Sequence, residues 1–198
     1  MSFFARGHLI LQRVSQIAVW VGGAALMLAA VMVTIDVFSR KLFGVTMSGS
    51  DEITGYVFAA ATTWAYSYCL LFRTNVRIDA FYGKFPPGLR ALMDVLGLGL
   101  LLLFMGYLTR KAVDVFVTSW ERDSVSVTTL AIPLWIPQLV WLMGLLLFCF
   151  TLVFVLLYAV LSLVRKDLET VQRVAGALSA EEEIAHETRG LGANNRDV

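Results

Sequence analysis

The sequence predicts an all-α integral membrane protein with four transmembrane helices. Hydrophobic residues make up 58% of its 198 residues and charged residues only 16%, whereas a soluble domain usually carries about 25% charged residues. A helix needs about 20 consecutive, mostly apolar residues to cross the hydrocarbon core of a bilayer. Four segments meet that requirement, at about residues 14–35, 53–72, 89–108 and 133–164.

The first span, residues 14–35, is too long for the apolar core of a secretory signal, which has 7–15 residues. We therefore interpret it as a retained span. The residues before it mix Phe3, Phe4 and Leu9 with Arg6 and Arg13. Such a mixture predicts a short interfacial helix at the N-terminus.

Opposite charges four residues apart occur at three span ends, where they share one helix face and can form ion pairs. The three pairs are Asp36 with Arg40, Arg90 with Asp94, and Arg110 with Asp114. A charge at bilayer depth marks a functional site by default, so an ion path through one of these residues stays open as an alternative. Their positions near the span ends favour paired or snorkelling interface charges.

The stretch "MSGSDEITGY", residues 47–56, precedes and opens the second span. Ser48 and Asp51 have the spacing of a capping box, in which the serine hydroxyl and the acid bind free backbone N–H groups. Asp51 and Glu52 also lie where the positive end of a helix favours anions. A contact with a basic residue of a partner and an ion path are the alternatives for these acids.

Small side chains recur every four residues along the second span, at Gly55, Ala59, Thr63 and Ser67. In lipid, small residues let helices approach closely, and packing drives helix association. This small-residue ridge has two interpretations: it packs against another helix of this chain, or it packs against a partner protein.

The connection after the second span alternates basic and aromatic residues, which predicts an interfacial element at an anionic lipid surface. Pro86 and Pro87 end that element and begin the third span. The fourth span begins at Pro133, where a missing N–H costs nothing. Residues 1–166 thus form a four-helix membrane domain. Residues 167–198 form a tail, with a short amphipathic helix and then a disordered segment.

The distribution of Lys and Arg predicts the orientation, because basic residues near span ends stay on the cytoplasmic side. Eleven of the 16 lie in the two tails and the middle connection, and five lie in the other two connections. Both termini are therefore predicted to be cytoplasmic.

The sequence contains no catalytic motif and predicts neither an enzyme nor a cofactor. His8 and His186 lie in the two tails, where they cannot hold a haem between the spans. Cys69 and Cys149 lie inside apolar runs and form no metal or redox cluster. The net charge of +1 gives no sign of a nucleic-acid partner.

Four motifs resemble the DctQ-like small membrane subunit of tripartite ATP-independent periplasmic (TRAP) transporters, over about residues 10–166. They are "TIDVFSRKLFG", "SGSDEITGYVFAAATTWAY", "FRTNVRIDAFYGKFP" and "LAIPLWIPQLVW". The matching positions are Asp36, Val37, Arg40, Glu52, Val76, Arg77, Ile78, Asp79 and Pro133. The chain departs from the family at Asn75, where many relatives carry His, and at Gly49, near which many carry Trp.

The resemblance implies a component of a bacterial inner-membrane importer of organic acids or related solutes. Its partners would be a large membrane (M-type) subunit, which moves substrate with sodium ions, and a periplasmic substrate-binding protein. The small subunit would enlarge the fixed scaffold of the large one. The candidate residues for assembly or membrane placement are Asp36, Arg40, Glu52, Arg77, Asp79 and the small-residue ridge. Two alternatives remain: a small oligomeric transporter or channel with Glu52 as coupling carboxylate, and a membrane anchor of a redox complex.

Overall fold

The computed structural model describes residues 2–74, 86–165, 167 and 170. Four helices make up most of this part: α1 (Ser2–Phe43), α2 (Ser50–Leu71), α4 (Pro87–Glu121) and α5 (Trp135–Val164). Among the described residues, β-structure is limited to an isolated antiparallel bridge between Val125 and Pro133. The predicted all-α class is confirmed for this part of the chain.

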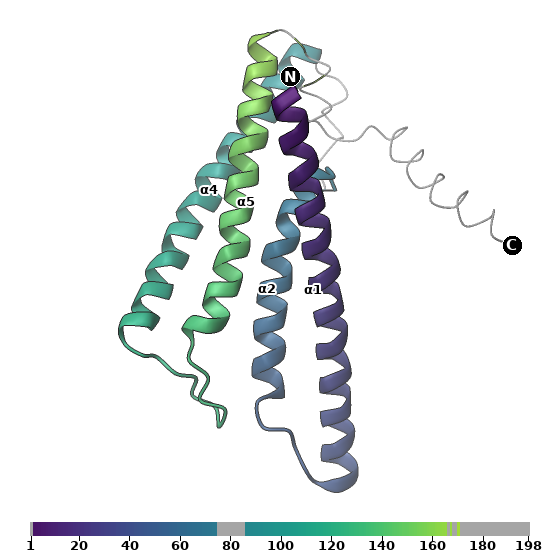
Figure 1. Ribbon diagram of the computed structural model, residues 1–198, viewed down its shortest axis with the longest axis vertical. Coiled ribbons are helices and arrows are strands. Elements are labelled where there is room, and N and C mark those ends of the chain that lie inside the picture. Colours follow the sequence, from purple (N-terminus) through teal and green to yellow (C-terminus); the bar gives the residue numbers. More distant parts are fainter. Residues whose placement is uncertain (1, 75–85, 166, 168–169, 171–198) are drawn as a thin grey trace, which may run out of the picture.

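The helices form a row rather than a ring (Figure 1). α1 packs on α2, α2 on α5, and α5 on α4. Because α5 lies between α2 and α4, the parallel pair α2 and α5 forms the middle of the row. The connections at residues 44–49 and 122–134 lie at the same end of the molecule, which we call the loop end. The start of α1 and the end of α5 lie at the opposite end.

Two helices are longer than the spans predicted within them. α1 has 42 residues and runs without a break from Ser2, so the residues before residue 14 are helical and continuous with the first span. Their interfacial position stays a prediction. α4 continues to Glu121, well past the predicted span end at residue 108. Hydrophobicity sets where a helix leaves the bilayer, but it does not end the helix, and no Gly or Pro interrupts residues 109–121.

Three of the four helices are long and apolar enough to cross a membrane by length and composition: α1 over Arg6–Phe43, α4 over Gly88–Glu121, and α5 over Trp135–Val164. α2 is not among them, because the Ser, Thr, Tyr, Trp and Gly residues along it lower its mean hydropathy. A fourth span in α2 therefore stays a prediction.

Prolines lie at or near the starts of α4 and α5, and the start of α5 differs from the predicted one. Pro86 is the N-cap of α4 and Pro87 its first residue, as predicted. α5 begins at Trp135, two residues after the predicted start, because Pro133 pairs with Val125 in the bridge. The predicted interfacial element within residues 75–85, and the predicted helix and disorder of the tail, lie outside the described residues.

The buried core follows α5. Leu145, Phe148, Leu152, Val155 and Ala159 lie on its covered face and are at most 6% exposed. Large apolar side chains elsewhere face outward; Trp20, Leu28 and Leu103 are each more than 70% exposed. Soluble monomers rarely expose apolar patches of this extent, so the outer surface of the row suits a lipid environment.

Candidate functional site

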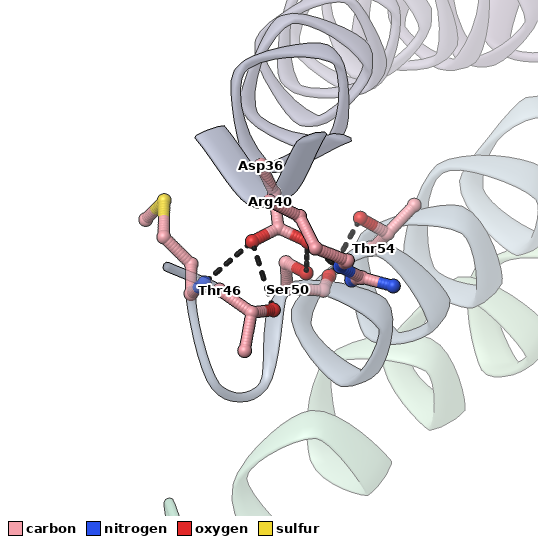
Figure 2. Close-up of polar contacts among 6 residues, drawn as sticks. Asp36, Arg40, Thr46, Ser50 and Thr54 are labelled. Atoms are coloured by element: carbon pink, nitrogen blue, oxygen red, sulfur yellow. Dashed lines mark hydrogen bonds and ion pairs between the residues drawn. The ribbon is translucent and has the colours of Figure 1, made fainter. Parts of the chain in front are cut away.

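Asp36, in the next-to-last turn of α1, is the centre of a polar cluster at the loop end (Figure 2). Its carboxylate is 2.7 Å from Arg40 Nη2, which confirms the predicted pair. Thr46 Oγ1 and Ser50 Oγ donate to it at 3.2 Å, and the Met47 backbone N–H donates as well. We call these five residues the Asp36 clamp.

The Asp36 clamp fixes the connection between α1 and α2. Residues 44–49 fold back so that Thr46 and Met47 reach a carboxylate some ten residues earlier in the chain. Asp36 is only 1% exposed, and a buried carboxylate is tolerated when donors satisfy both of its oxygens. Here both oxygens have protein donors, so the cluster acts as a structural junction.

Gly49 begins α2, and the predicted capping box is wrong. Gly49 is the N-cap, with φ +91° and no side-chain cap bond, a conformation that favours glycine. A Cβ atom there would lie 2.1 Å from Leu130 Cδ1. Ser48 is therefore one residue too early to cap, and its hydroxyl contacts the hydroxyl of Thr129 instead. Asp51 and Glu52 do lie in the first turn, as predicted.

Glu52 connects the start of α2 to the loop between α4 and α5. Its carboxylate accepts hydrogen bonds from the hydroxyls of Tyr56 and Thr128, and Thr128 Oγ1 is 2.9 Å from Ser126 Oγ. Glu52 lies just outside the predicted span at residues 53–72, at the membrane surface. The hydroxyls of Ser126, Thr128 and Tyr56 hold the pKa of Glu52 below its usual value because they stabilise its charged form.

The contacts of Ser48 with Thr129 and of Glu52 with Thr128 form a strap, which we call the loop strap. The strap holds residues 122–134 against the start of α2, so the hairpin of α1 and α2 is joined to the hairpin of α4 and α5 at the loop end. The sequence offers no signal for these contacts, since the partners are 76 and 81 residues apart.

The small-residue ridge divides into two parts. Thr63 and Ser67 are buried between α2 and α5: Thr63 lies beside Gly144, and the hydroxyls of Ser67 and Thr151 are 3.5 Å apart. Ala59 is half-buried. Gly55 is exposed, with no atom within 4 Å of the position a Cβ would take. Thr63 and Ser67 therefore pack against another helix of this chain, which was the first of the two interpretations of the ridge.

Close contacts at two further glycines were not anticipated from the sequence. A Cβ on Gly144 would lie 2.6 Å from Thr63 Oγ1, and one on Gly22 would lie 3.2 Å from Ala61 Cβ. The indole Nε1 of Trp64 donates to the Val140 carbonyl oxygen at 2.9 Å across the same α2–α5 contact. α2 is therefore held on one side by α1 and on the other by α5.

The other charged residues singled out in the sequence have contacts that differ from those of Asp36. Asp114 pairs with Lys111 at 3.3 Å rather than with Arg110, and both partners are more than half exposed. Asp94 is 3% exposed and, like Arg90, has polar contacts within the protein. Arg77 and Asp79 lie outside the described residues. Within the described ranges, no group of three His, Cys, Asp or Glu side chains is placed to hold a metal ion.

The comparison with protein families identifies the family of the chain. The family model described as "Tripartite ATP-independent periplasmic transporters, DctQ component" matches residues 29–166, which is more than half of the chain. The matched region includes the Asp36 clamp, the loop strap and the small-residue ridge. No curated protein and no solved structure matches the chain.

Proposed function

The chain belongs to the DctQ family of TRAP transporter components, and from this membership we propose that it is the small permease subunit of a secondary solute importer. In this proposal it scaffolds a large M-type membrane subunit that moves substrate with sodium ions. A periplasmic substrate-binding protein delivers the solute. The family match over residues 29–166 is the observation that carries the proposal.

The arrangement of the helices supports a scaffolding role. The helices form a row (Figure 1) that exposes large apolar side chains such as Trp20, Leu28 and Leu103. In this proposal the row widens the fixed part of the complex. The polar groups at the loop end hold the chain together: Asp36 accepts hydrogen bonds from Arg40, Thr46 and Ser50, and Glu52 accepts one from Thr128 in the loop strap. These contacts favour a mechanical function over an ion path.

For the membrane topology, we propose that α2 is the fourth span. α2 packs along α1 and α5, both of which are long and apolar enough to span. In lipid its polar side chains are tolerated because they face these neighbours, as Thr63 and Ser67 do. The Lys and Arg distribution then places the loop end in the periplasm and both termini in the cytoplasm of a bacterial inner membrane.

Affinity purification and uptake assays test this function. The tagged chain, expressed from its native locus, is expected to purify with a large multi-span membrane protein, and solute uptake in vesicles is expected to require both proteins and a binding protein. Uptake by liposomes that contain this chain alone would contradict the subunit assignment and favour the small-transporter alternative. Haem or flavin absorbance in the purified complex would favour the redox-anchor alternative.

Replacing Asp51 by asparagine and Glu52 by glutamine tests the role of the two acids. The loop strap loses its carboxylate acceptor, so we expect less large subunit in the purified complex, with an unchanged ratio of sodium ions to solute in the remaining uptake. Glu121→Gln, at an exposed acid at the end of α4, is the control. A changed ion ratio in the double variant would instead support an ion path through Glu52.

A further inference from the structure

α4 lies at one edge of the row, and charged side chains face outward from its second half (Figure 1). Four exposed residues recur there every three or four positions and so share one helix face. We call this face the outer α4 face; its residues are Tyr107, Arg110, Asp114 and Val117. Lys111 borders the face and pairs with Asp114. Arg110 forms no ion pair within the described part of the chain.

A contact between α4 and α5 gives the depth of the outer α4 face. Thr109 Oγ1 is 3.2 Å from Cys149 Sγ, and Cys149 is at the middle of α5. α5 has 30 residues without a charged side chain, so its middle is expected near the bilayer midplane. Arg110 and Asp114 follow Thr109 by one and five residues, or about 1.5 and 7.5 Å along the helix. Half of the hydrocarbon core is about 15 Å thick, so both charges lie inside it.

α2 gives the same depth independently. Asp114 and Gly144 each lie five residues toward the loop end from the contact of Thr109 with Cys149, so they are level with each other. A Cβ atom on Gly144 would lie 2.6 Å from Thr63 Oγ1. Thr63 is at the middle of the predicted span at residues 53–72. Asp114 is therefore level with the middle of that span.

α1 agrees with α2. Gly22, well inside the predicted span at residues 14–35, approaches Ala61 closely. The predicted α4 span at residues 89–108 is not level with these two spans, because the residues after it lie beside their middles. Centring residues 89–108 in the bilayer would place Val31, which is 53% exposed, outside the lipid. The levels of α1, α2 and α5 thus agree that the outer α4 face lies at bilayer depth.

Lipid is a poor cover for the outer α4 face. A charge near the midplane is costly unless it faces protein or water and has a partner of opposite charge. Arg110 would have to cross nearly half of the core, about 15 Å, to reach a headgroup, which is further than a side chain can snorkel. Lys111 and Asp114 neutralise each other. The face therefore fits a protein surface that supplies one carboxylate opposite Arg110.

We propose that the outer α4 face binds a membrane helix of the large M-type subunit, with a carboxylate of that helix opposite Arg110. This inference rests on the proposed function and its membrane topology. A second copy of this chain fits less well, because a two-fold axis along the membrane normal places residues of the same number at one depth. Arg110 would then face the partner's Arg110. α1, at the other edge of the row, has no charged residue between residues 14 and 35 and suits lipid.

Site-specific photocrosslinking in the assembled complex tests the proposal. p-Benzoylphenylalanine replaces Tyr107 on the outer α4 face or, as the matched control, Trp20 on α1; these aromatic side chains are 65% and 75% exposed. We expect a crosslink to the large subunit that is several-fold stronger from position 107 than from position 20. An equal or stronger crosslink from position 20, a crosslink from position 107 to a second copy, or no crosslink from position 107 would overturn the proposal.

Substitutions of Arg110 separate partner binding from folding. Because Arg110 has no ion pair among the described residues, Arg110→Gln is expected to leave the Tm of the isolated chain unchanged. It is expected to lower the amount of large subunit in the purified complex several-fold, whereas Arg110→Lys keeps the charge and most of the large subunit. Arg122→Gln, at the C-cap of α4, is the control and should have no effect. Full recovery with Arg110→Gln, or an equal loss with Arg122→Gln, would contradict the proposal.

Cysteine labelling of the chain expressed alone tests the depth. Val115 in α4 and Val125 in the following loop are 51% and 55% exposed, and each is replaced by cysteine in a chain with Cys69→Ala and Cys149→Ala. In membrane fragments open on both sides, a water-soluble maleimide is expected to label position 125 several-fold faster than position 115. Equal labelling would place this part of α4 in water and overturn the proposal.

The failure of the proposed function is distinguishable from the failure of this inference. If the wild-type chain purifies with no large membrane protein, the proposed function fails and this inference fails with it. If the large subunit is present but crosslinks elsewhere on the chain, the inference alone fails.

Discussion

Replacing Asp36 by alanine is expected to lower the Tm of the purified protein by about 10 °C and to reduce its yield from membranes. The substitution removes the acceptor for Arg40, Thr46, Ser50 and the Met47 N–H together. Donors left without an acceptor in a buried place are destabilising, and the connection between α1 and α2 loses its attachment to the last turns of α1.

Asp114→Ala is the matched control for this experiment. Asp114 is also an aspartate in a long helix with a basic partner, but its pair with Lys111 is more than half exposed on both sides. Exposed pairs contribute little to stability, so we expect a Tm change of less than about 2 °C. Equal effects of the two substitutions, measured by thermal unfolding in one detergent, would show that the Asp36 clamp does not hold the connection.

Replacing Gly144 by leucine is expected to separate α2 from α5. Even a Cβ atom at this position would lie 2.6 Å from Thr63 Oγ1 and 2.8 Å from Trp64 Cδ1. The Trp64 ring cannot move aside freely, because its Nε1 donates to the Val140 carbonyl oxygen. Overpacking of this kind costs about 3 kcal/mol, or about 10 °C in Tm for a chain of this size.

Two further variants show whether the effect comes from this contact. Gly106→Leu adds the same side chain to α4 in open space, so its Tm is expected to stay near the wild-type value. Thr63→Gly combined with Gly144→Ala removes part of the crowding that Gly144→Ala alone creates, so the two changes are expected to be non-additive. Full additivity in thermal unfolding would argue against a direct contact between the two positions.

The local features of this fold are predictable from the sequence. Asp36 and Arg40 are four residues apart, so helix geometry alone brings them together. Pro86 and Pro87 mark the start of α4 because proline fits the first turn of a helix but not its interior. Both predictions depend on neighbours within one or two helical turns, where backbone geometry leaves few alternatives.

The long-range contacts are not predictable in the same way. Ser48 fits a capping box by spacing, but the N-cap is Gly49, whose positive φ and closeness to Leu130 depend on the tertiary fold. Glu52 binds Thr128, 76 residues away, through a loop whose path no periodic pattern specifies. Gly144 lies in an apolar run, and its contact with Thr63 depends on the order of helices in the row. Such contacts depend on how whole helices pack.

The central position of α2 has a consequence for how the chain is inserted during synthesis. α2 is the helix that its own composition does not commit to the bilayer, yet it precedes α5, one of its two neighbours, by some sixty residues. In the proposed four-span topology, α1 alone then covers α2 until α5 has been made, over the close approach of Gly22 and Ala61. In that topology, a larger side chain at Gly22 would disturb the first contact available to α2, and loss of α2 from the bilayer would change the orientation of the spans that follow.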